Sequence, residues 1–501
     1  MHYDCPFRLA IDRIGRVPKA VIKLVLRALR GISMAQERGQ FSSKLGFILA
    51  AAGSAVGLGN LVAFPVMASK NGGAAFLIIY LLFIAFICYP VMMAEIAMGR
   101  RTTRNPVGAF SELSGGELHW RLAGMLAILT PFMIAVFYTV ITVWLVVYIK
   151  EIATGNLAAL SQPGNFGEVV ARPSLFGYLV LLLLAMFTIL LGGVKGGIER
   201  LARVLMPTLA VMLIALVGFV LTLENAFSGV RYYLVPDFSR LTLATVNGAL
   251  SQAFFSLSLG MGILITYGSY FSRNDNIAES TRMVAVADTA IAFCAGLLIL
   301  PAIFAFDPNT NTDDLSTSSV GLIFDFLPQI FLSMQDAVGY VGASLVAAIF
   351  FVLVFFAALT SMVSIIEIPI ACWIDELGMS RKKAVLFQAG LLTLFAIPAT
   401  MSLGISDFFT NFTSYGGMSK SFFDLVSDVF YETILPFVGF TVCLFCAYRW
   451  NFSGLTEELV IGDDSYAGSW LEKYIKFSLG TVIPIVLLLV FLSTVNQIYL
   501  S

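Results

Sequence analysis

Long apolar runs separated by short polar segments dominate the chain from residue 44 to residue 495. The runs are roughly 20 residues or longer, the length that an α-helix needs to cross the hydrocarbon core of a bilayer. We expect eleven transmembrane spans at 44–69, 75–98, 122–150, 174–192, 200–223, 242–270, 283–306, 341–373, 384–404, 425–448 and 475–495. The pattern therefore predicts an all-α polytopic membrane protein.

Two of the predicted spans carry glycine and polar residues in the middle of the apolar run. The first contains Gly-Ser-Ala-Val-Gly-Leu-Gly-Asn at 53–60, and the sixth contains Ser-Leu-Ser-Leu-Gly-Met-Gly at 256–262. Glycine costs about 1 kcal/mol in a helix interior, and irregular backbone at membrane depth is tolerated only where it faces protein or a water-filled cavity. Interruptions at matching positions of two five-span halves indicate a midplane site in an inverted-repeat transporter.

An interrupted helix offers free carbonyl oxygens for a small cation and free amide groups for a carboxylate. Asn60 and Ser256 lie beside the two breaks and could complete a cation shell. Thr360 and Ser361 lie in the long eighth span, where back-bonding to a helix carbonyl accounts for most such hydroxyls and is the favoured explanation from the residues alone. Asp288 lies within the seventh span with no cation near it in sequence, and a charge at that depth marks a functional position.

Positive charge gathers in the loops between spans two and three, four and five, six and seven, and eight and nine. The positive-inside rule places this side in the cytoplasm together with the amino terminus. An odd number of spans then places the carboxyl terminus outside. We expect Glu95, just before the first of these loops, to make a structural contact at the membrane interface. Residues 1–37 form a basic amphipathic extension suited to an anionic membrane face, or an addition before a start at Met34.

The remaining composition excludes other classes of protein. A net charge of -1 gives no support to a nucleic-acid partner, and most of the six cysteines fall inside apolar runs, where they are small buried hydrophobic residues. With two histidines in the chain and no converging carboxylates in the spans, we expect no catalytic residues and no enzyme activity.

The motifs at the breaks are similar to those of a known family. Segments 53–65, 256–262 and 357–361 resemble the first, sixth and eighth spans of the neurotransmitter:sodium symporter family, in particular its bacterial amino-acid transporters with the leucine-transporter-like fold. The resemblance runs from about Arg38 through the last span. It implies two inverted five-helix repeats with broken first and sixth helices, over 38–223 and 242–448, followed by an eleventh helix at 475–495.

The resemblance also implies two sodium ions and a central site for an amino-acid substrate. The first sodium would be bound by the Ala55 carbonyl and the side chains of Asn60, Ser256 and Asp288, together with the substrate carboxylate. The second would be bound by the carbonyls of Gly53, Val56 and Ala357 and the hydroxyls of Thr360 and Ser361.

For the substrate, the resemblance assigns the carboxylate to the Gly59 amide and the Tyr138 hydroxyl. Monoamine carriers of the family have aspartate at the position of Gly57, so an amino acid fits this chain better. The substrate-binding residues implied are Ala55, Leu58, Gly59, Ile134, Tyr138, Phe255, Ser256, Ser258, Met261, Ser361 and Ile365. This mostly apolar set favours a hydrophobic or aromatic L-amino acid without selecting one.

Two departures from the family pattern change the expected mechanism. Animal relatives bind chloride with residues that match Tyr80, Gln252, Ser256 and a serine at the position of Ala292. Because Ala292 has no hydroxyl and Asp288 stands where asparagine is usual, we hypothesise that Asp288 replaces chloride.

The second departure lies in the outer gate, where Ala63 takes the place of the usual arginine. Asp428 is the expected acidic partner, with Asp407 a weaker candidate, and closure would then rest on Tyr138 and Phe255. The inner gate keeps the family pattern, and its expected residues are Arg38, Asp375, Phe41 and Tyr270.

These expectations describe a sodium-coupled amino-acid symporter that works by alternating access in a bacterial inner membrane. A non-transporting amino-acid sensor on the same fold remains the main alternative. A membrane enzyme has no converging site to support it, and an ion channel would conduct without saturable dependence on an amino acid. The oligomeric state stays open.

Overall fold

The computed structural model describes residues 39–306 and 322–500, and residues 40–500 belong to one compact unit. Each predicted span is helical within these residues. The first five are α3 (Lys44–Ala55) with η1 (Gly59–Ala63) and α4 (Phe64–Lys70), α5 (Ala74–Phe83) with η2 (Ile84–Cys88) and α6 (Tyr89–Thr102), α8 (Leu118–Ala153), α11 (Leu175–Leu191), and η3 (Val194–Glu199) with α12 (Arg200–Val220). The prediction of an all-helical polytopic membrane protein is thereby confirmed.

The second half repeats the pattern of one broken and several continuous helices. Its spans are α14 (Leu243–Ser256) with α15 (Ile263–Gly268), α16 (Ile277–Phe306), α19 (Gln335–Leu377), α20 (Arg381–Met401), α22 (Phe422–Val426) with η7 (Ser427–Ile434), α23 (Leu435–Leu444) and η8 (Phe445–Arg449), and α25 (Trp470–Phe477) with η9 (Ser478–Val482), α26 (Ile483–Val495) and η10 (Asn496–Leu500). Within the described residues, eight helices are long and apolar enough to cross a membrane, and the bent pair 44–55 and 59–70 makes nine. Together with the shorter α11 and the broken pair α14–α15, these helices account for the eleven predicted spans.

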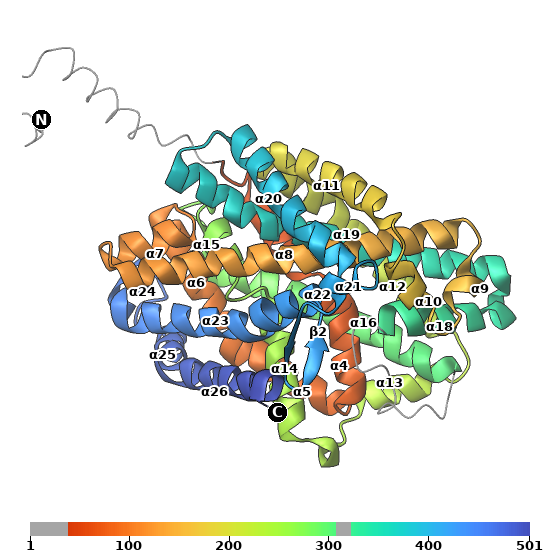
Figure 1. Cartoon of the computed structure of the whole chain (residues 1–501). Helices are drawn as coiled ribbons and strands as arrows, with labels where there is room; N and C mark the ends of the chain where they lie inside the picture. The colour runs from red at the N-terminus through yellow and green to blue at the C-terminus, as the bar shows by residue number, and fades with distance from the viewer. Residues whose placement is uncertain (1–38, 307–321, 501) are drawn as a thin grey trace, which may run out of the picture. The chain divides into compact units, whose positions relative to one another are not determined.

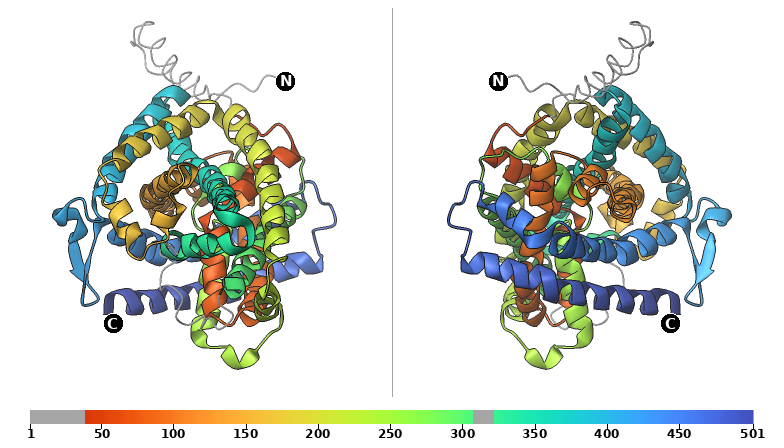
Figure 2. Two further views of the ribbon diagram at one scale, coloured as in Figure 1. Left: turned by 90° about the vertical axis from the view of Figure 1, so that its right-hand side faces the viewer. Right: turned by 90° about the vertical axis from the view of Figure 1, so that its left-hand side faces the viewer.

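The connections contain short helices that the apolar pattern does not predict. They are α7 (Pro106–Ser114), α9 (Leu157–Leu160), α10 (Asn165–Val170), α13 (Ala226–Leu234), η4 (Phe238–Arg240), η6 (Leu322–Phe326), α18 (Leu327–Ser333), α21 (Asp407–Thr410) and α24 (Asn451–Val460). A two-stranded antiparallel hairpin, β1 (Thr413–Tyr415) and β2 (Met418–Lys420), follows α21. Figure 2 shows this hairpin beside the carboxyl-terminal end of the chain, where the rings of Tyr415 and Tyr499 lie 5.2 Å apart.

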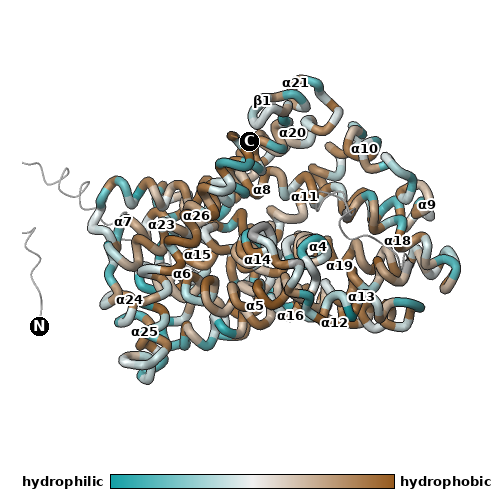
Figure 3. Tube along the Cα trace, turned by 90° about the horizontal axis from the view of Figure 1, so that it is seen from below, coloured by the Kyte–Doolittle hydropathy of each residue, from teal (hydrophilic) through white to brown (hydrophobic). Residues whose placement is uncertain are grey.

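Two long helices, α8 and α19, pack along each other in the middle of the bundle and bury most of their residues (Figure 1). The hydrophobic residues of the tube gather in the central part of the helices, whereas hydrophilic residues gather near α7 and α24 at one end and near α9 and β1 elsewhere (Figure 3). An apolar exterior between polar ends is the distribution that a bilayer requires.

The first span breaks after Ala55, where Val56 takes an extended conformation with ψ 102° and the helix axis bends by 52°. The sixth span breaks after Ser256, and φ is positive at Ser258, Gly260 and Gly262. A Cβ on Gly260 would lie 2.8 Å from the Leu435 carbonyl oxygen. Gly260 therefore allows both the left-handed backbone conformation and the close packing of α23 at this position.

Glu95 secures the sixth-span break from the second span. Its carboxylate accepts a hydrogen bond of 2.9 Å from the Gly260 amide, and the side chain is fully buried. Glu95 thus makes the structural contact that we expected, and α6 continues past it for about two further turns. The break of α14–α15 thus has a built partner for one of its free amide groups.

Candidate functional site

The broken first span lies against the eighth. A Cβ on Gly53 would lie 3.6 Å from Cβ of Thr360, which places the end of α3 directly on α19. Thr360 Oγ1 donates to the Ala357 carbonyl at 3.0 Å, so the back-bonding expected of a helical threonine is present. The residues predicted for the second sodium are all buried at this junction: Gly53, Val56, Ala357, Thr360 and Ser361.

A cluster of buried polar groups joins spans one, six and seven. Asn60 Nδ2 donates to Asp288 Oδ1 at 2.7 Å and to Ser256 Oγ at 2.9 Å. Ser256 Oγ donates to Asp288 Oδ2 at 2.8 Å. The three side chains have no exposed surface. The structure thus brings together the side chains predicted for the first sodium, with their oxygens gathered around the amide nitrogen of Asn60.

The surroundings of this cluster supply further hydrogen bonds and no cation. The Tyr80 hydroxyl lies 3.1 Å from Ser256 Oγ, and Gln252 donates to the Gly59 carbonyl at 2.8 Å. Among the described residues, no lysine or arginine makes an ion pair with Asp288. A buried carboxylate without a cationic partner is costly in a membrane protein, which makes Asp288 a candidate cation ligand.

A small cavity lies between the two breaks. Its lining residues are Ala55, Gly57, Gly59, Tyr138, Phe255, Ser258, Met261, Ser361 and Ile365. Three residues of the predicted substrate set lie elsewhere: Ser256 is in the polar cluster, Leu58 lines a second cavity, and Ile134 is buried in α8. The rest of the set surrounds one cavity that is mostly apolar.

Glycine is required at two walls of this cavity. A Cβ on Gly57 would lie 2.8 Å from the Tyr138 hydroxyl, and one on Gly59 would lie 2.9 Å from the Phe255 ring. The Leu58 amide donates to the Tyr138 hydroxyl at 3.1 Å. The Tyr138 hydroxyl therefore lies against the backbone of the first-span break, at the wall of this cavity.

A second, larger cavity of about 140 Å³ adjoins the first through Tyr138 and Phe255, which line both. Its other walls are mostly apolar side chains of the first span, α8, η6 and the tenth span, including Ala63 and Tyr431. The rings of Phe255 and Tyr431 meet edge to face at 4.5 Å. Aromatic side chains therefore separate the two cavities.

The outer acidic residue Asp428 has a partner that the sequence did not indicate. It accepts hydrogen bonds from Lys420 Nζ at 3.0 Å and from the Tyr415 hydroxyl at 2.8 Å. Burial and the Asp428 carboxylate raise the pKa of Tyr415 above its usual range. Asp407, the weaker candidate, begins α21. The cation thus comes from the β1–β2 hairpin, and a lysine in a polar loop carries no sequence signal for such a pairing.

On the other side of the bundle, Asp375 accepts hydrogen bonds from the Asn105 amide at 3.0 Å and from its Nδ2 at 2.9 Å. The predicted partner Arg38 lies outside the described residues. Phe41 packs edge-on against Tyr270, and its amide donates to the Tyr270 carbonyl. Phe41 and Tyr270 therefore meet in the segments just before α3 and just after α15 (Ile263–Gly268), whereas Asp375 lies near the end of α19.

Sequence reasoning missed an ion pair on this same side. Arg381 donates from both Nη atoms to the Glu367 carboxylate at 2.6 Å, and the Tyr270 hydroxyl donates to Glu367 at 3.0 Å. Glu199 accepts a hydrogen bond of 2.9 Å from the Ser42 amide, in the segment just before α3. The partners of each pair lie far apart or in different helices, so spacing along the chain gives no signal for them.

Comparison with known proteins agrees with this geometry. The model of the sodium:neurotransmitter symporter family matches residues 38–166 and 167–500. The chain belongs to this family. It is 33% identical to the uncharacterized sodium-dependent transporter YhdH of Bacillus subtilis over 92% of this chain and 98% of that protein. A sodium-dependent transporter of Haemophilus influenzae is 30% identical over 91% of this chain and 98% of its own length.

A solved structure shares the fold. The crystal structure of MhsT in complex with L-phenylalanine is 39% identical, has a TM-score of 0.78 and covers 91% of this chain and 100% of its own. The sodium- and chloride-dependent GABA transporter ine of Drosophila melanogaster is 26% identical over 73% of this chain and 43% of that protein. The chain is therefore a multi-pass membrane protein of a sodium-dependent transporter family and not an enzyme.

Proposed function

We propose that this family member is a symporter that couples sodium entry to the uptake of a hydrophobic or aromatic L-amino acid. The observation that carries the proposal is the mostly apolar cavity between the two broken spans, with the Tyr138 hydroxyl and the Gly59 region at one end. A carboxylate would bind at that end, and the side chain would lie against Phe255, Met261 and Ile365. The L-phenylalanine complex of MhsT supports this substrate class.

Two sodium ions would bind beside the substrate. The first would be bound by Ala55, Asn60, Ser256 and Asp288, and the second by Gly53, Val56, Ala357, Thr360 and Ser361. The hydrogen bonds of the Asn60–Ser256–Asp288 cluster support the first set, and the contact of Gly53 with Thr360 supports the second. The carboxylate of Asp288 supplies the negative charge that chloride supplies in animal relatives, which makes transport independent of chloride.

The coupling of sodium to substrate transport follows from the helices that each sodium ion connects. Sodium at the second set connects α3 with α19 and favours the outward-facing state, and substrate contact with the first sodium then permits closure. Each ligand shifts the equilibrium only by its difference in affinity between the two states. Release of the second sodium into a sodium-poor cytoplasm frees α3 and opens the inner side around Phe41, Tyr270 and Asp375.

The membrane and its orientation belong to the same proposal. We place the chain in a bacterial inner membrane, with the cation-rich loops and the amino terminus in the cytoplasm and the carboxyl terminus outside. The two five-helix repeats would cover 38–223 and 242–448.

A thermal-shift screen tests the substrate assignment. Purified protein would be heated with each standard amino acid, in sodium and in potassium salts. We expect stabilisation by phenylalanine, leucine and similar residues only when sodium is present. Equal stabilisation in both salts, or preference for a charged amino acid, would contradict the proposal.

A further inference from the structure

The larger of the two central cavities is lined by aromatic rings from three different spans. They are Phe255 on α14, Tyr431 on η7, Phe137 on α8 and Phe423 on α22. The Tyr431 ring meets the Phe255 ring edge to face at 4.5 Å, and it lies 6.0 Å from the Phe137 ring. The rings of Phe137 and Phe423 are 5.8 Å apart. Tyr431 is therefore the ring of the tenth span that connects the sixth span with the third.

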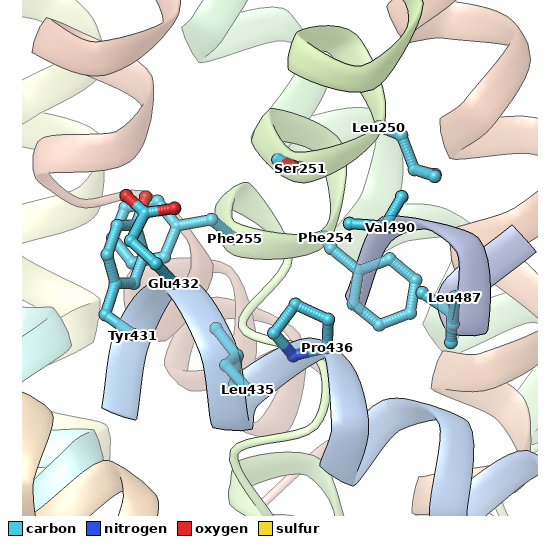
Figure 4. A pocket seen from close by; sticks show the side chains of 10 residues that line it. All are labelled: Leu250, Ser251, Phe254, Phe255, Tyr431, Glu432, Leu435, Pro436, Leu487 and Val490. Carbon is cyan, nitrogen blue, oxygen red and sulfur yellow. The ribbon is translucent and has the colours of Figure 1, made fainter. Parts of the chain in front are cut away.

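Phe255 lines both central cavities, and two contacts hold its ring in place. The first is with the first-span break, where a Cβ on Gly59 would lie 2.9 Å from the ring. The second is with Tyr431, and Figure 4 shows these two side chains next to each other, one from the sixth span and one from the tenth. An edge-to-face aromatic pair is more stable than its buried area alone accounts for. Tyr431 thus helps to fix the ring that separates the two cavities.

The charged residue of the tenth span has a different partner. Asp428 Oδ2 accepts hydrogen bonds from Lys420 Nζ and from the Tyr415 hydroxyl, and both donors belong to the β1–β2 hairpin. Less than a fifth of the Lys420 and Asp428 side chains is exposed. This ion pair connects the tenth span to the loop that precedes it, whereas Ala63 of the first span carries no charge. Three residues after Asp428, Tyr431 makes the contact with another span.

We propose that Tyr431 is a positioning residue of the outer gate, and that its ring holds Phe255 closed over the bound amino acid. The ring contact takes the place of the arginine–aspartate pair that is usual in the family. The inference rests on the proposed function, because it requires an amino acid in the small cavity beneath Phe255. Both contacts of Tyr431 involve its ring. Phenylalanine at this position would therefore serve as well, whereas leucine would keep the apolar bulk and lose the aromatic pair.

Dissociation of labelled L-phenylalanine from the purified full chain in sodium salt tests the role of Tyr431. Bound label is displaced by excess unlabelled phenylalanine, and the number of binding sites per protein is measured in parallel. Tyr431→Leu should raise the dissociation rate about three- to tenfold, the factor that corresponds to the loss of one aromatic pair, without changing the number of sites. Tyr431→Phe should release phenylalanine at the rate of the unaltered protein. Tyr448→Leu, which removes an exposed tyrosine from η8 of the same span, is the matched control and should also leave the rate unchanged.

Phe137→Leu keeps the test decisive if Tyr431→Leu does not fold. It removes the ring on α8 that lies against Tyr431 and leaves Tyr431 itself in place, so the dissociation rate should rise about twofold or more. Unchanged dissociation in the folded variants, while the unaltered protein binds phenylalanine in sodium, would overturn this inference alone. An equal rise in Tyr431→Phe would also overturn it, because the role would then belong to the hydroxyl. Absence of sodium-dependent phenylalanine binding in the unaltered protein would overturn the proposed function and this inference together.

Discussion

Asp288→Asn removes the negative charge from the buried cluster while it keeps the shape of the side chain. In the structure the two carboxylate oxygens accept hydrogen bonds of 2.7 Å from Asn60 and 2.8 Å from Ser256, and an amide can replace only one of these acceptors. Asp288 has no exposed surface, so water does not compensate for the lost charge. The variant thus isolates the electrostatic part of the proposed sodium site.

The expected magnitude follows from Coulomb's law. Two unit charges about 4 Å apart interact by about 4 kcal/mol at an effective dielectric constant of about 20. Rearrangement of Asn60 and Ser256 offsets part of this energy, so we expect a loss of about 2–4 kcal/mol in sodium binding. Since about 1.4 kcal/mol corresponds to tenfold, the sodium concentration for half-maximal binding should rise roughly 30-fold to several hundredfold.

The assay is sodium-dependent stabilisation of purified protein against heat, measured in chloride and in gluconate salts. The unaltered protein should give the same sodium curve in both salts. Asp288→Asn should bind sodium weakly in gluconate and regain part of its affinity in chloride, because a bound anion can replace the missing charge. Asp464→Asn, which changes an exposed acid in the loop before α25, is the matched control. Unchanged sodium affinity in Asp288→Asn, without any chloride effect, would refute the reasoning.

Three further substitutions test other parts of the site. Gly57→Ala places a methyl group 2.8 Å from the Tyr138 hydroxyl, so amino-acid affinity in the thermal-shift titration should fall at least tenfold; unchanged affinity would contradict the close approach. Arg381→Gln leaves Glu367 buried without its cation, which should lower unfolding stability by about 3–5 kcal/mol; a loss under 1 kcal/mol would contradict a buried pair. Lys420→Gln breaks a partly exposed pair, so stability should change by about 1 kcal/mol or less, and a larger loss in thermal unfolding would contradict that estimate.

The apolar pattern predicts much of this fold because membrane spans obey a simple length rule. The two helix breaks were also predictable, since glycine and polar residues within an apolar run favour irregular backbone, which at membrane depth must face protein or a water-filled cavity. The pattern cannot predict the β1–β2 hairpin, which lies in a polar loop and makes contacts with the chain end through Tyr415 and Tyr499. The apolar pattern also does not predict short connecting helices such as α13.

Individual site residues were predictable only where the family motif supplied their roles. The motif names Asn60, Ser256 and Asp288, and the structure joins them by hydrogen bonds. No motif names the partners that depend on tertiary contact. Lys420 reaches Asp428 from a hairpin, and Glu95 reaches the Gly260 amide from another span. Such pairings become visible only when the helices are packed.

The most direct test of the central claim is uptake of labelled L-phenylalanine into proteoliposomes that contain the purified protein. With sodium outside and potassium inside, the account predicts accumulation of the amino acid above its external concentration. A sodium ionophore should abolish this accumulation, and replacement of chloride by gluconate should leave it unchanged. Sodium-dependent binding of the amino acid without accumulation in the liposomes would contradict transport and favour a sensor on the same fold.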